Sequence, residues 1–135
     1  MSISIEKWGK DHWSTFAYIE TRIVDHGGQP QIEHMRCNNQ LHPQFGHRGG
    51  CASAYPTKLR EGEVPGHDDW SCLDDAEAAG LLENVGTGLY RVYKLTKVGS
   101  SVARQLRDYK ANGGTFATFI PIEQAQLEGL LPVAP

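Results

Sequence analysis

The chain has 135 residues, of which 39% are hydrophobic and 21% charged, and its formal net charge at pH 7 is −3. A chain of this length and composition can bury a core of its own, which excludes an intrinsically disordered protein and a mini-protein that needs disulfides to fold. No window approaches the apolar length of a membrane span, so no membrane partner is expected. The first residues lack the apolar stretch of a secretory signal and the 3 cysteines are an odd number, which together predict reduced thiols and a cytoplasmic location.

The first predicted element is a helix from Asp11 to about Val24. Asp11 is a suitable N-cap residue, and His26-Gly27-Gly28 is a suitable end. The apolar residues recur at spacings that place them on one face of this helix: Trp13, Phe16, Ala17, Ile23 and Val24. The aromatic residues at this end, Trp8, Trp13, Phe16 and Tyr18, could also form a stacking platform for bases, but their spacing favours a core face.

Residues 29–66 show no helical or strand periodicity. Four prolines and five glycines lie in this region, which predicts a long irregular connection with one short helix or strand around Ala52 to Leu59. Connections this long are uncommon inside a compact domain and usually carry a function or a ligand.

A set of metal-binding residue types lies in this connection. Cys37, His42, His47 and Cys51 follow the spacing Cys-x4-His-x4-His-x3-Cys, with His34 nearby. Two thiolates and two imidazoles are the ligands of a tetrahedral structural zinc site, so zinc is the cofactor that the sequence suggests. The first two residues are further apart than in standard zinc knuckles, and the alternative is a polar loop with scattered histidines and thiols.

A second helix is predicted from Trp70 to Ala79. Asp68 or Asp69 can cap its N-terminus, and Gly80 is placed to end it in the left-handed conformation. Leu81 to Glu83 and Leu89 to Leu95 are predicted to be two strands of a hairpin, because the loop between them contains glycines that can adopt positive backbone angles.

A third helix is predicted after Thr96, which can act as its N-cap, and it ends near Asn112. Its inward face is predicted from the spacing of Val98, Val102, Leu106 and Tyr109, and its exposed side carries Arg104, Arg107 and Lys110. Beyond Phe119, a short amphipathic piece from Ile122 to Leu131 is expected to dock on the body or on a partner. The sequence thus predicts a single α+β domain made of residues 1–28, 29–66, 67–112 and 113–135.

The third of these parts resembles a known family. The run Leu73-Asp74-Asp75-Ala76-Glu77-Ala78-Ala79-Gly80-Leu81-Leu82, followed by Tyr90-Arg91-Val92-Tyr93-Lys94-Leu95-Thr96-Lys97-Val98-Gly99, is similar to winged helix-turn-helix regulators of the MarR and PadR type. In that family a recognition helix ends in an Ala-Gly-Leu turn, a wing follows, and a Leu-Thr-x-x-Gly sequence starts the next helix. The resemblance covers about 40 residues. It implies a winged-helix-like fold and a DNA-binding regulator of transcription.

The charges of this half allow three interpretations. Residues 61–83 contain eight acidic residues and no Lys or Arg, whereas residues 91–110 contain six basic residues and one acidic residue. In the first interpretation, Arg91, Lys94, Lys97 and Arg104 contact nucleic acid, because affinity for DNA comes largely from neutralised phosphates. In the second, a protein partner binds the acidic helix through Asp68, Asp69, Asp74, Asp75 and Glu77. In the third, the two surfaces pair within the monomer or between the protomers of a homodimer.

A last constellation is His67-Asp68-Asp69, with Asp11-His12 as its companion if the two helix starts lie close together. These starts share glycine, aspartate, tryptophan and serine in register over 9–14 and 66–71, which we interpret as two helix starts built alike. Histidine and carboxylate could hold a metal that activates water, as in a hydrolase, although capping alone explains the aspartates. Cys72 is predicted to be a small core residue. Because no catalytic signature is present, the first prediction is a non-catalytic binding protein.

Overall fold

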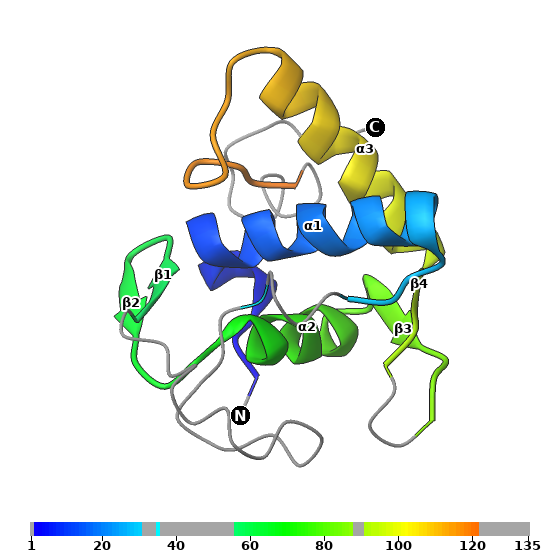
Figure 1. Ribbon diagram of the computed structural model, residues 1–135. Coiled ribbons are helices and arrows are strands. Elements are labelled where there is room, and N and C mark those ends of the chain that lie inside the picture. The colour runs from blue at the N-terminus through cyan, green and yellow to red at the C-terminus, as the bar shows by residue number, and fades with distance from the viewer. Residues whose placement is uncertain (1, 31–34, 36–55, 88–90, 122–135) are drawn as a thin grey trace, which may run out of the picture.

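The computed structural model describes residues 2–30, 35, 56–87 and 91–121 of the chain (Figure 1). In chain order the elements are η1 (Ile5–Lys7), α1 (Lys10–His26), β1 (Thr57–Leu59), β2 (Gly62–Val64), α2 (Asp69–Ala78), β3 (Leu82–Asn84), β4 (Tyr93–Leu95) and α3 (Lys97–Ala111). Within these residues the fold is α+β, as predicted, with three α-helices and two antiparallel hairpins. The predicted piece from Ile122 to Leu131 lies outside the described residues.

Helix α1 begins two residues earlier than the predicted Asp11 cap implies, because its N-cap is Gly9. Asp11 lies in the first turn, where one carboxylate oxygen, Oδ2, accepts a hydrogen bond from the backbone N–H of Lys58 at 2.6 Å. Glycine is needed at position 9 because a Cβ there would lie 2.5 Å from the carbonyl carbon of Leu59. The predicted end is confirmed, since Gly27 is the C-cap with φ of 77°.

Helix α2 has the predicted caps. Asp68 accepts a hydrogen bond from the backbone N–H of Ser71 at 2.9 Å, which satisfies one of the unpaired donors of the first turn. Gly80, with φ of 82°, follows the helix in the left-handed conformation. In α1 the corresponding aspartate, Asp11, lies inside the first turn and is not the cap. The interpretation of the two similar segments as helix starts built alike is therefore wrong.

Two short hairpins flank α2 in the chain. Thr57 to Leu59 is a strand within the segment where a short helix or strand is predicted. It pairs with Gly62 to Val64, which the sequence predicts to be irregular, so the two form a hairpin. The second hairpin pairs β3 with β4 as predicted, with Leu82 opposite Leu95. Its second strand begins at Tyr93, later than the sequence predicts.

Helix α3 is capped by Thr96, whose side-chain oxygen accepts from the backbone N–H of Gly99 at 2.9 Å. Its buried face is Gly99, Val102, Ala103 and Leu106, and Val98 is 55% exposed. The prediction that Val98 faces inward is therefore wrong. The helix is turned by the contact at Gly99, where a Cβ would lie 1.9 Å from the carbonyl oxygen of Leu81.

Helix α1 lies between the other two helices and contacts both (Figure 1). Trp13 and Phe16 of α1, and Trp8 just before it, are each 1% exposed and form the centre of the core, which confirms the core-face interpretation. The ring edges pack on one another, with Trp13 at 4.8 Å from both Trp8 and Phe119 between ring centroids. The core also takes in Ile19, Leu73, Ala76, Leu81, Leu82, Tyr93, Val102 and Leu106. None of the helices in the described ranges has the length and apolar character needed to cross a membrane.

Candidate functional site

The N-terminal ends of α1 and α2 meet at a cluster of two histidines and one aspartate. His12 lies in the first turn of α1, and His67 lies just before the cap of α2. Both reach Asp75, in the middle of α2. The Nε2 atom of His12 is 2.7 Å from Asp75 Oδ2, and the Nε2 atom of His67 is 2.6 Å from the same oxygen. One carboxylate oxygen thus joins residues that are 63 and 8 positions away in the sequence.

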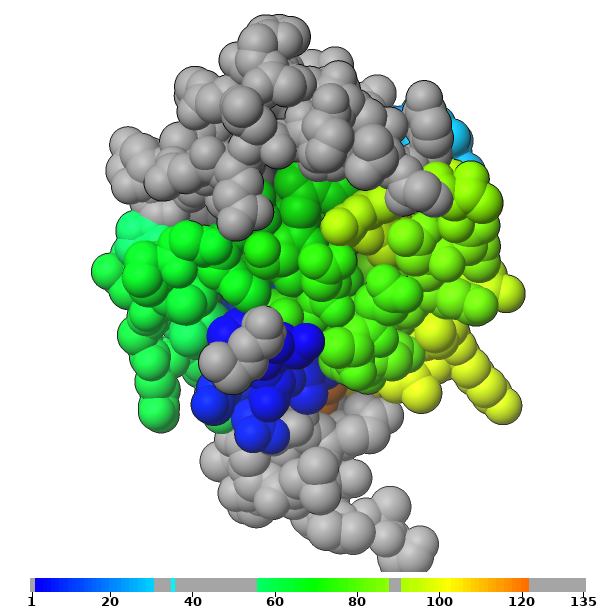
Figure 2. Space-filling view, turned by 90° about the horizontal axis from the view of Figure 1, so that it is seen from below, coloured from blue at the N-terminus to red at the C-terminus, as the bar shows by residue number. Residues whose placement is uncertain are grey.

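The N-terminal segment completes the hydrogen bonds of this carboxylate. The backbone N–H of Ile3 donates to Asp75 Oδ1 at 3.0 Å. Figure 2 shows that the N-terminal residues, in blue, lie against the green surface formed by residues 56–87. Burial would raise the pKa of Asp75, but the hydrogen bonds from His12, His67 and Ile3 outweigh it and lower the pKa to about 2. Asp75 is therefore an ionised acceptor at neutral pH.

The second nitrogen of His12, Nδ1, has no hydrogen-bond partner within the described part of the chain. The His12 side chain is 0% exposed, and its Nδ1 atom has no hydrogen bond to any described residue. Trp8 stacks on the imidazole with 5.0 Å between the ring centroids and 17° between the planes, which covers one face of the ring. A buried nitrogen without a partner costs free energy, and such atoms in a native structure call for an explanation.

Cys72 lies beside the two histidines. It is buried, as predicted, on α2 one turn before Asp75. One ligand atom from each of His12, His67 and Cys72 lies within 4.8 Å of the other two. Two imidazole nitrogens and a thiolate are ligands that suit zinc, and three protein ligands leave one position of a tetrahedron for another donor.

This arrangement confirms part of the constellation predicted around His67. The structure does bring His12 and His67 together, with 5.4 Å between their ring centroids. It does not add the predicted aspartates. Asp68 is the cap of α2, and Asp69 accepts a hydrogen bond from the hydroxyl of Thr15. Asp75 and Cys72 take their place, and helical spacing in the Cys72-Leu73-Asp74-Asp75 sequence was the signal that could have identified them.

The predicted zinc ligands Cys37, His42, His47 and Cys51 lie outside the described residues. The predicted partner surface on α2 is largely buried in the molecule. Asp68, Asp69 and Asp75 are 2%, 8% and 2% exposed, which leaves Asp74 and Glu77 at the surface.

Two of the four predicted nucleic-acid contacts have acidic partners. Arg91 donates to Asp74 at 3.1 Å and to the hydroxyl of Tyr93 at 2.8 Å, and its guanidinium lies 5.0 Å above the ring of Trp70. Lys94 lies 3.5 Å from Glu83 across the β3–β4 hairpin. Lys97 and Arg104 are exposed on α3. The pairing of acidic and basic surfaces within the monomer is therefore seen at Arg91 and Lys94.

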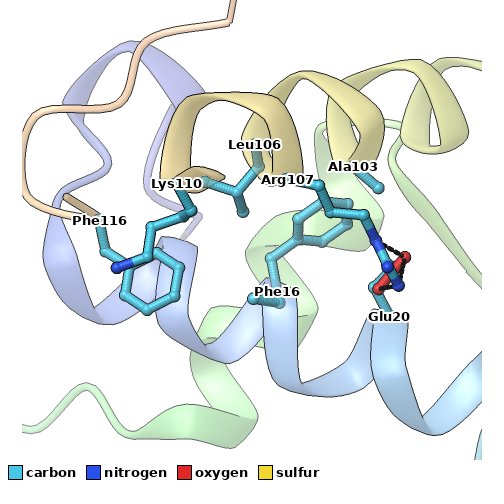
Figure 3. Close-up of a pocket in the computed structure, with 8 residues that line it drawn as sticks. Phe16, Glu20, Ala103, Leu106, Arg107, Lys110 and Phe116 are labelled. Atoms are coloured by element: carbon cyan, nitrogen blue, oxygen red, sulfur yellow. Dashed lines mark hydrogen bonds and ion pairs between the residues drawn. The ribbon is translucent and has the colours of Figure 1, made fainter. Parts of the chain in front are cut away.

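A pocket of about 230 Å³ lies between α1 and α3 (Figure 3). Its apolar lining is Phe16, Ala17, Ala103, Leu106 and Phe116. At one side Arg107 binds both carboxylate oxygens of Glu20, at 2.8 and 2.6 Å, so this residue of the predicted exposed side joins the two helices. The pocket is smaller than the roughly 300 Å³ at which small-molecule sites begin.

Comparison with models of protein families, with curated proteins and with solved structures finds no match to this chain.

Proposed function

We propose that this chain is a small metal-binding protein, and that His12, His67 and Cys72 hold one divalent ion of the zinc class between α1 and α2. The observation that carries the proposal is that His12, His67 and Cys72 each place one ligand atom within 4.8 Å of the other two, while the buried Nδ1 atom of His12 lacks a hydrogen-bond partner among the described residues. A bound ion gives this nitrogen a partner. Nitrogen and sulfur donors favour zinc over magnesium or calcium, which prefer oxygen ligands.

The burial of the ligands supports binding rather than catalysis. The side chain of His12 is 0% exposed, that of His67 is 11% exposed, and Cys72 is 2% exposed. Among these three, only His67 offers a surface to solvent. An ion here joins the start of α1 to α2, and its binding free energy adds to the stability of the fold.

The test is the metal content of the protein purified without chelator, followed by a titration with Co²⁺, which reports thiolate and imidazole ligands in its absorption spectrum. His67→Gln and Cys72→Ala each remove one ligand. His26→Gln is the matched control, because His26 is exposed at the far end of α1. We expect about one ion per chain in the wild type and in His26→Gln, and loss of the ion from the two ligand variants.

Two outcomes count against the proposal. The first is a wild-type protein that takes up neither Zn²⁺ nor Co²⁺. The second is full retention of the ion, with an unchanged cobalt spectrum, in both folded ligand variants. In the second outcome the ion is bound elsewhere, with Cys37, His42, His47 and Cys51 as the first set to substitute.

We propose nucleic-acid binding, as in a transcription regulator, as a second candidate function. The order α2, β3–β4 hairpin and α3, with the expected caps, supports the winged-helix resemblance, and Lys97 and Arg104 extend from α3 into solvent. Lys97→Ala/Arg104→Ala should weaken binding to duplex DNA and reduce its dependence on salt, because fewer phosphates are neutralised.

The double variant Lys7→Ala/Lys10→Ala is its control, since both lysines are exposed near the start of α1 and the charge change is the same. Fluorescence anisotropy with a labelled random duplex at several salt concentrations measures the effect. Equal affinities and equal salt slopes for the two double variants would remove the role of α3.

A further inference from the structure

We infer that Asp75 is a positioning residue that fixes the tautomers of both histidines, so that His12 and His67 each present Nδ1, not Nε2, to the ion. This inference rests on the proposed metal site. It adds two things to that site: the ring nitrogens that bind the ion, and the residue, Asp75, that orients the two rings without binding the ion itself.

The argument begins with the direction of two hydrogen bonds. Asp75 Oδ1 accepts from the backbone N–H of Ile3, and Oδ2 contacts one nitrogen of each imidazole. An ionised carboxylate only accepts hydrogen bonds, so in both contacts the histidine nitrogen is the donor. The hydrogen therefore resides on Nε2 of His12 and on Nε2 of His67. In a neutral imidazole the other nitrogen then carries the lone pair.

An imidazole binds a metal ion only in its neutral form, through the ring nitrogen that carries a lone pair instead of a hydrogen. Because the hydrogens on Nε2 of both rings are directed at Asp75 Oδ2, the nitrogen that each ring has left for an ion is Nδ1. The two lone pairs are thus on Nδ1 of each ring, and the one on His12 is the buried atom that has no partner in the described part of the chain.

The position of Asp75 is itself fixed from three directions. Its backbone belongs to the second turn of α2, its Oδ1 atom accepts from Ile3, and its Oδ2 atom accepts from both histidines. Cys72 is three residues earlier on the same helix and therefore lies on the same side of it. This is the pattern by which a carboxylate outside the ligand set orients metal-binding imidazoles and makes them more basic.

The direct test needs no variant. Protein labelled with ¹⁵N in its histidines is loaded with Zn²⁺, and two-bond ¹H–¹⁵N correlation spectra identify which ring nitrogen keeps its hydrogen. We expect two of the six histidines to show a hydrogen on Nε2 and a metal-shifted Nδ1. The two rings are assigned in spectra of the metal-free protein, where His12→Gln and His67→Gln each remove one set of signals. Zinc bound through Nε2 of either histidine would overturn the inference and leave the metal site standing.

A second test is the zinc affinity of Asp75→Asn. The amide has one acceptor oxygen and an NH₂ donor, so it cannot accept from both histidines and from Ile3. Loss of such an outer partner lowers metal affinity by about 10- to 100-fold, whereas Asp74→Asn, which removes the same charge at the neighbouring exposed position, should leave it unchanged.

Unchanged affinity in a folded Asp75→Asn protein would overturn the positioning role. If Asp75→Asn does not fold, the wild-type spectra still decide the question. A wild-type protein that binds no zinc would overturn this inference together with the proposed function.

Discussion

Substitution of Gly99 by alanine tests how the second half of the molecule is held together. Gly99 lies in the first turn of α3 directly against Leu81, the residue that follows the turn at Gly80. An ideal Cβ at position 99 would lie 1.9 Å from the Leu81 carbonyl oxygen, 2.8 Å from its carbonyl carbon and 3.1 Å from its Cα. All three atoms belong to the backbone, so no flexible side chain can move aside.

Two effects of opposite sign decide the magnitude. Alanine is favoured over glycine inside a helix by about 1 kcal/mol, which would stabilise the protein. Inserting a methyl group into a close backbone contact costs about 1 to 3 kcal/mol, and here the value lies at or above the upper end because α3 must move away from the backbone of Leu81. We therefore expect a net loss of about 2 kcal/mol in the free energy of unfolding, or a fall in Tm of about 4 to 8 °C.

The assay is urea unfolding monitored by circular dichroism. Ser100→Ala is the control, because Ser100 is the next residue of α3 and is exposed. The control should gain a few tenths of a kcal/mol from helix propensity. A Gly99→Ala protein as stable as Ser100→Ala would refute the reasoning, since it would show that α3 and Leu81 do not approach as closely as the structure has them.

Two further predictions concern ionic contacts. The pKa of Asp75 is lowered from 3.8 to about 2, so its ionised form contributes about 2 kcal/mol of stability that is fully present above pH 4 and is lost as the pH falls through about 2. Urea unfolding of the metal-free protein at pH 5 and pH 2.5 should show this loss, and an equal loss in Asp75→Asn would contradict it. Arg107→Ala should lower stability by about 1 kcal/mol, because it leaves Glu20, whose side chain is 9% exposed, without its ion-pair partner. Arg104→Ala, on the exposed side of the same helix, should have no measurable effect, and equal stabilities of the two variants would contradict the prediction.

The sequence predicted α2, α3 and the hairpin between them because their signals are local. Asp68 and Thr96 cap the helices from three residues away, and Gly80 ends α2 through its own backbone angle. The face of α3 was mispredicted at Val98 because the contact of Gly99 with Leu81 turns the helix, and that contact spans 18 positions. Tertiary contacts of this kind leave no periodic signal in the helix itself.

In this chain the two motifs on which the resemblance is based are in direct contact. The Ala-Gly-Leu turn places the Leu81 carbonyl where only a residue without a Cβ can meet it, and the Leu-Thr-x-x-Gly sequence supplies that residue as Gly99. Thr96 is hydrogen-bonded to both residues of this contact. Its side-chain oxygen accepts from the Gly99 N–H, and its own backbone N–H donates to the Leu81 carbonyl at 3.1 Å. The residues that carry the resemblance are thus explained by the packing of α3 against the turn after α2. This packing stabilises the fold whether or not the protein binds DNA.

The candidate site was predictable only in part, for a similar reason. The two similar helix starts drew attention to His12 and His67, yet α1 begins at Lys10 and α2 at Asp69, so the helices start at different points of the shared pattern. His12 is therefore inside its helix, whereas His67 precedes the cap of the other. Both histidines contact Asp75, which lies outside the two similar segments 9–14 and 66–71. The contact of His12 with Asp75 depends on the packing of α1 against α2. The shared residues account for each helix start separately, and the contact between the helices creates the site.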